Sequence, residues 1–96
     1  MNKKIAIIGA GGHGKVVGEI ALLNKYDPID FFDDQVNEIK KFPFKICGNL
    51  DQLKNNIKDY DVFFVAIGNN RKRYDQISWI RKEKINILYR SFQIKF

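Results

Sequence analysis

A glycine-rich segment directly after an apolar run is the feature that most constrains how this chain folds. The run Ile5–Ile8 (IAII) leads into Gly9–Lys15 (GAGGHGK), which contains the spacing Gly-x-Gly-x-x-Gly. This arrangement is typical of a first parallel strand that turns into a first helix. Glycines let an anion approach the backbone, and the first turn of the helix offers unpaired N–H groups and a positive dipole end. The pattern predicts a site for a phosphate-bearing small molecule, and a tight turn that binds no ligand is the alternative.

Strand and helix patterns alternate along the rest of the chain. Apolar runs predict strands at Lys4–Gly9, Ile29–Phe32, Phe44–Cys47 (an edge strand), Asp61–Gly68 and Ile85–Leu88. Helices are expected over Gly14–Lys25 and Leu50–Ile57, with a loop over Gln35–Phe44. A third helix, which Asn69 and Asn70 can cap, is expected to run to about Lys84. Strands that alternate with helices imply a parallel sheet. The sequence therefore predicts an α/β fold, a small Rossmann-like three-layer fold with a parallel sheet of about four strands and helices on both faces.

Apolar residues at helical spacing predict which faces of two helices pack against this sheet. These residues are Val16, Ile20 and Leu23 in the first helix, with Val17 and Ala21 beside them, and Tyr74, Ile77 and Ile80 in the last. Asn49 precedes the middle helix and is a candidate N-cap, because its side chain can accept a hydrogen bond from the first helical turn.

Polar residues follow two further strands at the edge where parallel strands end. Asp33 and Asp34 close the second strand, and a carboxylate there can accept hydrogen bonds from a ribose or a base N–H. An Asx turn or a helix cap is the alternative. Gly68, Asn69 and Asn70 follow the third strand, and Asn can bind a base or sugar or cap the next helix. Because ligands of open sheets bind beyond the carboxyl ends of the strands, we expect both segments and the glycine loop to line one crevice.

The chain offers little for catalysis or for metal binding. His13 is the single histidine, and in the loop it could donate a hydrogen bond to a phosphate or sugar oxygen. No Ser, Cys or carboxylate stands at triad spacing from it, so nucleophilic catalysis is not expected. One His and one Cys cannot make a metal cluster. Lys15 is not followed by Ser or Thr, which excludes a P-loop.

Charge and hydropathy exclude some partners. The formal net charge is +6, and the Lys and Arg residues are spread over the chain, with clusters at Arg71–Arg73 and Arg81–Lys84 on one predicted helix. A solvated helix face explains these clusters, and the charge favours anionic ligands without indicating nucleic acid. No stretch approaches the ~20 apolar residues that span a membrane. The single Cys47 fits a reducing compartment, so we expect a cytoplasmic protein without nucleic-acid or membrane partners.

Four motifs in order along the chain resemble one family of enzymes. They are Lys4–Val17, Phe31–Asp34, Ile46–Asn49, and Phe64–Asn70 with Arg73 beyond. They are similar to the sugar O-/N-acyltransferases of the sialic acid O-acetyltransferase and bacillosamine-pathway (PglD/NeuD) type. The resemblance covers nearly the whole chain.

This resemblance implies a function for the chain. In the family, a small Rossmann-like N-terminal domain binds a nucleotide-sugar acceptor, often a UDP-linked amino sugar. A left-handed β-helix then binds acetyl-CoA, forms trimers and carries the catalytic histidine. The resemblance implies that residues 1–88 are the nucleotide-sugar-binding domain. It places Gly11, Gly12, His13 and Gly14 against the phosphates and sugar, and Asp33, Asp34, Gly68, Asn69 and Asn70 against the nucleoside.

The segment 89–96 stands where the family's β-helix begins, and it departs from the family pattern. Tyr89 replaces the usual His, Phe92 replaces a small residue, and the sequence stops at Phe96 before one full coil. We therefore expect no acetyl-CoA site, no cofactor and no catalytic histidine in this chain, and no acetyl transfer by it alone. A separate β-helix acyltransferase chain is a candidate partner. Without the trimer-forming domain, a monomer or weak dimer is expected.

Two other functions fit part of the sequence. An NAD-binding domain is allowed by the Gly-x-Gly-x-x-Gly spacing and by the acid at Asp33 or Asp34. Against it, the helix opens with His13-Gly14-Lys15, and no substrate domain supplies a hydride acceptor. A non-catalytic module with a vestigial pocket is the third possibility, although the glycine loop is intact.

Overall fold

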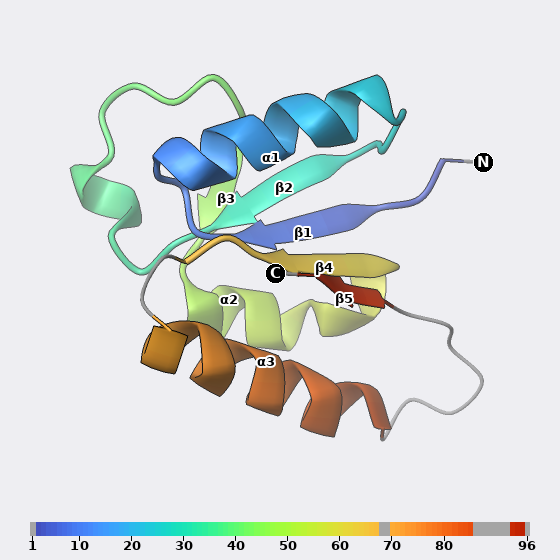
Figure 1. Cartoon of the computed structure of the whole chain (residues 1–96). Helices are drawn as coiled ribbons and strands as arrows, with labels where there is room; N and C mark the ends of the chain where they lie inside the picture. Colours follow the sequence, from blue (N-terminus) through green and yellow to red (C-terminus); the bar gives the residue numbers. More distant parts are fainter. Residues whose placement is uncertain (1, 68–69, 86–92, 96) are drawn as a thin grey trace.

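Parallel strands form one sheet at the centre of the molecule (Figure 1). In the computed structural model, which describes residues 2–67, 70–85 and 93–95, the sheet has five strands in the order β3-β2-β1-β4-β5. The strands are β1 (Ile5–Ile8), β2 (Ile29–Phe32), β3 (Ile46–Gly48), β4 (Val62–Val65) and β5 (Gln93–Lys95). Every neighbouring pair runs parallel. The short central strands are nearly continuous apolar runs because both of their faces are covered.

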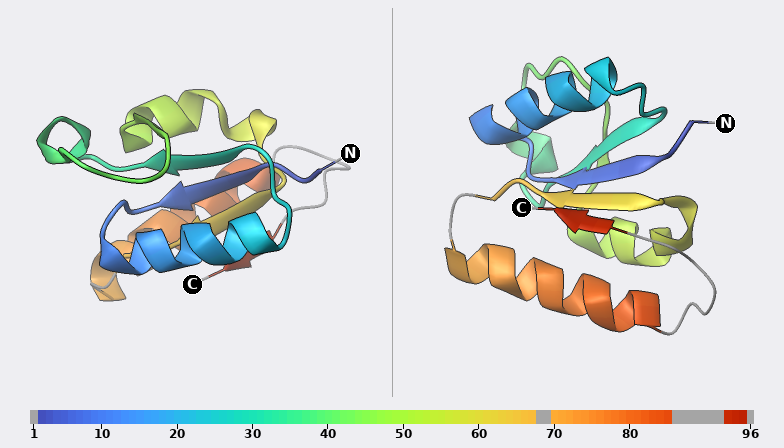
Figure 2. Two further views of the ribbon diagram at one scale, coloured as in Figure 1. Left: turned by 90° about the horizontal axis from the view of Figure 1, so that it is seen from above. Right: turned by 45° about the vertical axis from the view of Figure 1, so that its right-hand side comes forward.

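Helices cover both faces of this sheet. Helix α1 (Gly12–Leu23) lies on one face, and α2 (Leu50–Asn55) and α3 (Asn70–Ile85) lie on the other (Figures 1 and 2). Two single-turn 3₁₀ helices, η1 (Val36–Glu38) and η2 (Ile57–Asp59), lie in the connections. The predicted Rossmann-like α/β class with helices on both faces is confirmed. Among the described residues, no helix is both long enough and apolar enough to cross a membrane.

Helix α1 packs on the sheet through small residues. Its buried residues are Gly14, Val17, Gly18 and Ala21. A Cβ atom added to Gly14 would lie 2.0 Å from the carbonyl oxygen of Gly9, so helix and loop approach backbone to backbone. The expected packing face was wrong in part: Val17 and Ala21 are buried, but the exposed fractions of Val16, Ile20 and Leu23 are 50%, 54% and 82%. Large side chains do not fit where the backbones approach this closely, so the small residues face the sheet.

The opposite face is packed by large side chains. Phe32 and Phe63 of the sheet form one cluster with Leu53 of α2 and with Ile77 and Ile80 of α3. Ile77 and Ile80 point inward as predicted. The prediction for Tyr74 was wrong, because its side chain is 70% exposed and lies outside this contact.

The ends of several elements differ from the predictions. Ile85 is the last residue of α3, so the strand predicted at Ile85–Leu88 does not begin there, and residues 86–88 lie outside the described part. The charged run Arg81–Lys84 favours helix, which carries α3 through Ile85. The last strand is β5, which lies inside the segment 89–96 that was predicted as a tail. The domain division at residue 88 remains a prediction.

The capped start of α2 follows the sequence closely. Asn49 is the N-cap as predicted: its side chain accepts the N–H of Gln52, whose side chain in turn accepts the N–H of Asn49. This reciprocal pair is a capping box. The helix then ends at Asn55 rather than at Ile57, which belongs to the 3₁₀ helix η2.

The strand order defines where a ligand can bind. From β1 the chain builds β2 and β3 on one side of the sheet, and it then returns to place β4 on the other side of β1. The connections after β1 and β4 therefore diverge at the carboxyl edge. In open parallel sheets, this divergence opens the crevice that receives ligands.

Candidate functional site

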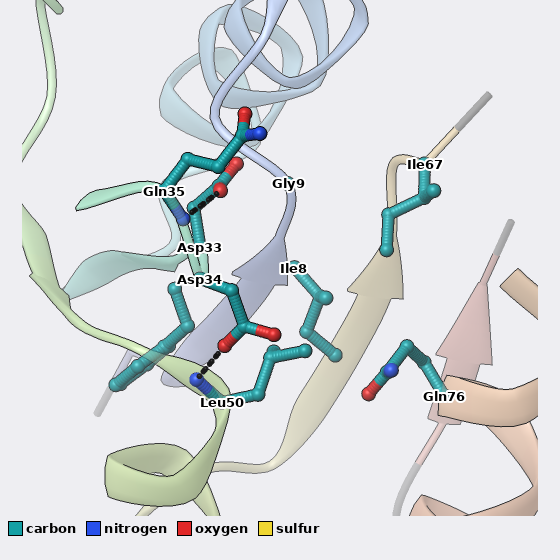
Figure 3. Close-up of a pocket in the computed structure, with 9 residues that line it drawn as sticks. Ile8, Gly9, Asp33, Asp34, Gln35, Leu50, Ile67 and Gln76 are labelled. Atoms are coloured by element: carbon teal, nitrogen blue, oxygen red, sulfur yellow. Dashed lines mark hydrogen bonds between the residues drawn. The ribbon is translucent and has the colours of Figure 1, made fainter. Parts of the chain in front are cut away.

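A cavity opens at this divergence, on the face that α2 and α3 cover (Figure 3). Its volume is about 380 Å³, within the ~300–1,000 Å³ typical of small-molecule sites. Apolar side chains from the sheet form its floor, and the polar side chains come from the segment directly after β2 and from α3. The lining residues are Ile8, Gly9, Phe32, Asp33, Asp34, Gln35, Leu50, Ile67 and Gln76.

The glycines of the loop fall into two pairs. Gly9 has a φ of +109° and, with an added Cβ, would meet the Ala66 carbonyl oxygen at 2.7 Å. Gly14 is buried against Gly9, so the fold itself requires glycine at both positions. An added Cβ at Gly11 or Gly12, in contrast, has no atom within 4 Å. The fold therefore does not require glycine at Gly11 or Gly12, and open space lies in front of the N-terminus of α1.

Asp33 ties the glycine loop to the end of β2. One of its carboxylate oxygens accepts the backbone N–H of Ala10 at 2.8 Å, and the other accepts the N–H of Gln35 at 2.8 Å. The second of these bonds closes the Asx turn that the sequence left open as an alternative. Asp33 thus lines the cavity and also fixes the geometry of the loop beside it.

Asp34 supports the neighbouring helix with one oxygen only. Its Oδ1 accepts the backbone N–H of Leu50, the first residue of α2, at 3.1 Å. A carboxylate at a helix N-terminus is stabilised by the dipole, so the helix-cap alternative applies to Asp34. Its other oxygen points toward the space beside Ile8 (Figure 3) and receives no hydrogen bond from the described part of the chain. That oxygen is available to a ligand donor.

His13 lies apart from the cavity. Its ring is centred 6.2 Å from the ring of Phe64, and both side chains line a second, largely apolar groove on the α1 face. The exposed Val16 and Ile20 of α1 border the same groove, whose volume is about 390 Å³. The structure therefore does not bring His13 together with Asp33 and Asp34, and its contact with a phosphate or sugar stays a prediction.

The third predicted segment is only partly described. Gly68 and Asn69 lie outside the described residues, and Asn70 is the first residue of α3. Ile67, directly before this segment, lines the cavity. The predicted ligand contacts of Gly68, Asn69 and Asn70 stay predictions.

Of the residues that line the cavity, only Asp33 and Asp34 were among the predicted site residues, and two of the others come from helices. Leu50 lines it from the start of α2, and Gln76 lines it from α3. Gln76 stands one helical turn before the fully buried Ile80 and so shares its inward face. A polar residue on the buried face of a helix, close to a ligand loop, was the signal that could have found it.

A second polar cluster lies at the other end of β2. The Tyr60 hydroxyl donates a hydrogen bond to the Asp30 carboxylate at 2.7 Å. Burial, reinforced by Asp30, raises the pKa of the nearby Cys47 thiol to about 11 and also raises the pKa of Tyr60. The thiol therefore stays protonated at neutral pH and is a poor nucleophile. Among the described residues, no group of His, Cys, Asp and Glu is arranged to hold a metal ion.

Comparisons with known proteins place this geometry in context. The PglD N-terminal domain family matches residues 4–80. The acetyltransferase domain of PglB from Neisseria gonorrhoeae FA1090 is 38% identical with a TM-score of 0.72, and the match covers 85% of this chain and 40% of that one. The same domain has been solved in complex with acetyl coenzyme A.

A second enzyme gives a more distant match. PerB from Caulobacter crescentus, solved in complex with CoA and GDP-perosamine, is 27% identical with a TM-score of 0.66. The match covers 83% of this chain and 38% of PerB. The chain thus spans about 40% of the length of the structures that it matches. A search of the curated proteins found no match.

Proposed function

The chain belongs to the PglD N-terminal domain family. We propose that it binds a nucleotide sugar and is the acceptor-binding part of a sugar acetyltransferase. The two structural relatives support the class of ligand, because one was solved with GDP-perosamine and the other with acetyl coenzyme A. The proposed acceptor is a nucleoside-diphosphate amino sugar, with UDP as the nucleotide part.

The observation that carries this proposal is the pair Gly11 and Gly12. Gly12, in the first turn of α1, costs up to ~1 kcal/mol relative to alanine, and no close contact requires glycine at the N-cap Gly11 or at Gly12. Their missing side chains leave the first N–H groups of α1 open, and no side chain caps this helix. Such a helix start favours a diphosphate.

The cavity supplies the other half of the proposed site. It begins at Gly9, where the glycine loop leaves β1, so a ligand with its phosphates at α1 can extend directly into it. The apolar floor of Ile8 and Phe32 suits the flat face of a base, and the free oxygen of Asp34 can accept a base or ribose donor. Asp33 contributes by holding the Ala10 N–H and hence the loop.

Acetyl transfer needs groups that this site does not contain. The described residues that line the cavity include carboxylates and amides but no histidine, and Cys47 lies elsewhere with a raised pKa. We therefore propose that acetyl-CoA and the catalytic base belong to protein beyond the matched region, in a further domain or a separate β-helix chain. The role of the present chain is to hold and orient the acceptor.

The proposal is tested by thermal unfolding with UDP, a UDP-sugar, GDP, NAD and CoA. A ligand at 100 times its Kd stabilises the folded state by about 2.7 kcal/mol, so UDP and the UDP-sugar should raise the Tm. A response to NAD alone would instead identify a dinucleotide site. No response to any compound would favour a module with a vestigial pocket.

A variant of the loop separates binding from folding. Gly11 has φ −105° and ψ −162°, an extended conformation that valine adopts readily, but it is the N-cap of α1, where glycine is preferred to valine, so Gly11→Val should lower the Tm of the free protein only modestly. The added side chain would fill the space in front of α1 and abolish the response to UDP. Glu19→Ala, an exposed change further along α1, is the matched control and should respond like the wild type. A full response by Gly11→Val would contradict the proposed phosphate position.

A further inference from the structure

Helix α1 carries a stripe of large apolar side chains on its outer side. Val16, Ile20 and Leu23 are four and three residues apart, so they lie along one line of the helix, and each is at least half exposed. Among the described residues, α1 is the only α-helix on its face of the sheet (Figure 1). The stripe therefore has no helix to pack against within the described part of the chain.

The apolar groove beside His13 and Phe64 lies next to this stripe. Its volume is about 390 Å³, and Val16 and Ile20 belong both to the stripe and to the lining of the groove. Stripe and groove together form one exposed apolar surface, which we call the α1 patch. Contiguous apolar surfaces of this kind mark sites of protein association.

The charges around the α1 patch differ from those of the whole chain. The net charge of +6 favours separation of two copies in solution. None of the described residues that line the groove is Lys, Arg, Asp or Glu. Helix α1 contains one residue of each sign, Lys15 and Glu19. Two copies can therefore meet through this patch without bringing their excess of Lys and Arg together.

A two-fold axis can pair the stripe with itself. When such an axis crosses α1 at right angles, level with Gly18, the two helices lie side by side and run antiparallel. Val16 of each copy is then level with Ile20 of the second copy, and Leu23 is level with His13 at the end of the groove. The apolar side chains of both copies thus meet along one seam.

Lys15 and Glu19 complement each other in the same arrangement. They are four residues apart and flank the stripe on one side of α1. In an antiparallel pair with this axis, equal flanks of the two helices meet. Lys15 of each copy then lies about 3 Å along the helix axis from Glu19 of the second copy, which a lysine side chain spans easily. Two ion pairs of opposite charge therefore form, one on each side of the axis.

We propose that the α1 patch is the interface of a two-fold dimer of this chain. The occupant of the patch is a second copy, because its apolar stripe and its two charges are complementary to themselves under one rotation. The inference goes beyond the proposed function and does not rest on it, since the nucleotide cavity lies on the other face of the sheet. A patch built on one helix predicts a weak, concentration-dependent dimer.

Sedimentation equilibrium of the full chain between about 10 μM and about 1 mM measures this association. The average mass of the wild type should rise from the chain mass of 11.2 kDa toward twice that value. Ile20→Glu places a carboxylate in the apolar seam and should hold the mass at 11.2 kDa throughout. Tyr74→Glu is the matched control, because it adds the same charge at an exposed residue of α3, and it should associate like the wild type.

Charge reversals test the antiparallel pairing. Lys15→Glu makes the chain less positive and Glu19→Lys makes it more positive, so general repulsion would change the dimer Kd in opposite directions. The proposed pairing instead sets like charges together in both variants, and each should raise the Kd by about fivefold or more. The double variant keeps the net charge of the wild type and restores the opposite pairs, so its Kd should return to the wild-type value. Circular dichroism and the Tm of each variant show that it is folded.

Three outcomes would overturn the proposal. If the wild type keeps the mass of a single chain at the highest concentration, copies do not pair and the patch is left for a further domain or another protein. If Ile20→Glu associates like the wild type, the dimer uses another surface. If the two single charge reversals change the Kd in opposite directions, general repulsion explains the result and the antiparallel pairing is wrong.

Discussion

The two faces of the sheet are packed by opposite means. On the α1 face, Gly14 and Gly18 bring the helix so close that added Cβ atoms would lie 2.0 Å from Gly9 and 2.7 Å from Phe44. On the other face, α2 and α3 pack on the sheet through the large side chains of Leu53, Ile77 and Ile80. Packing on the α1 face depends on residues without side chains, and packing on the α2–α3 face depends on large side chains.

This difference places the two halves of the candidate site. The close approach of α1 sets its N-terminus at the carboxyl edge of β1, where a diphosphate can meet its N–H groups. On the other face, the cavity is lined by residues at the strand ends, by Leu50 of α2 and by Gln76 of α3. Both halves meet at Gly9, so one ligand can use both faces of the sheet.

The largest expected loss of stability comes from a substitution on the close-packed α1 face. Gly14→Ala should destabilise the protein by about 3 kcal/mol or more, because the methyl group collides with the backbone of Gly9 and cannot be accommodated by a rotamer change. Urea unfolding followed by circular dichroism measures the loss. Gly12→Ala, in the first turn of the same helix, should be neutral or stabilising; equal losses in both variants would refute this account of α1.

The next prediction concerns the face packed by large side chains. Leu53 is fully buried in the α2–α3 cluster, so Leu53→Ala should cost about 3 kcal/mol through lost burial and the remaining cavity. Leu53→Met is the volume-matched control and should cost less than about 1.5 kcal/mol. A loss below 1 kcal/mol for the alanine variant would mean that α2 collapses onto the sheet and that large side chains do not hold this face apart.

A smaller effect concerns pH on the same face. The fold favours the protonated Cys47 thiol, whose pKa is about 11 rather than its ordinary 9.0. The folded state then binds more protons than the unfolded state above pH 9, so this contribution is complete below pH 9 and is lost as pH rises through 11. Cys47→Ala should flatten the decline of Tm between pH 9 and 11. Identical slopes for wild type and variant would exclude a role for the thiol.

The smallest effect is expected on the outer side of α1. Leu23 is 82% exposed, so Leu23→Ser should change stability by less than about 0.5 kcal/mol. Ala21, two positions earlier, is buried, and Ala21→Ser serves as the contrasting variant with a clear loss. A large loss for Leu23→Ser would restore the packing face expected from hydrophobic spacing.

The fold was predictable where hydrophobic pattern and packing agree. The apolar runs of β1 and β4 and the capping box at Asn49 carry local signals, and the structure follows them. Part of the α1 face was missed because Gly14 and Gly18 carry no hydrophobic signal although they make the contact. Strand β5 has only a short, partly polar sequence, and its pairing with β4 rather than local preference defines it.

The candidate site was predictable in part for similar reasons. Asp33 and Asp34 follow directly from the end of a strand, and the structure places both at the cavity. Their hydrogen bonds to Ala10 and Leu50 join segments distant in sequence, which no local pattern reports. Gln76 required knowledge of which face of α3 turns toward the sheet.

The division of the loop glycines has an evolutionary consequence. The fold requires glycine at Gly9 and Gly14, because a side chain there would collide with the backbone, whereas Gly11 and Gly12 face open space. A lineage that stopped binding its ligand could accumulate side chains at Gly11 and Gly12 without harm, while selection for a folded protein would still retain the other pair. Drift at this loop would therefore record the loss of binding separately from the loss of structure.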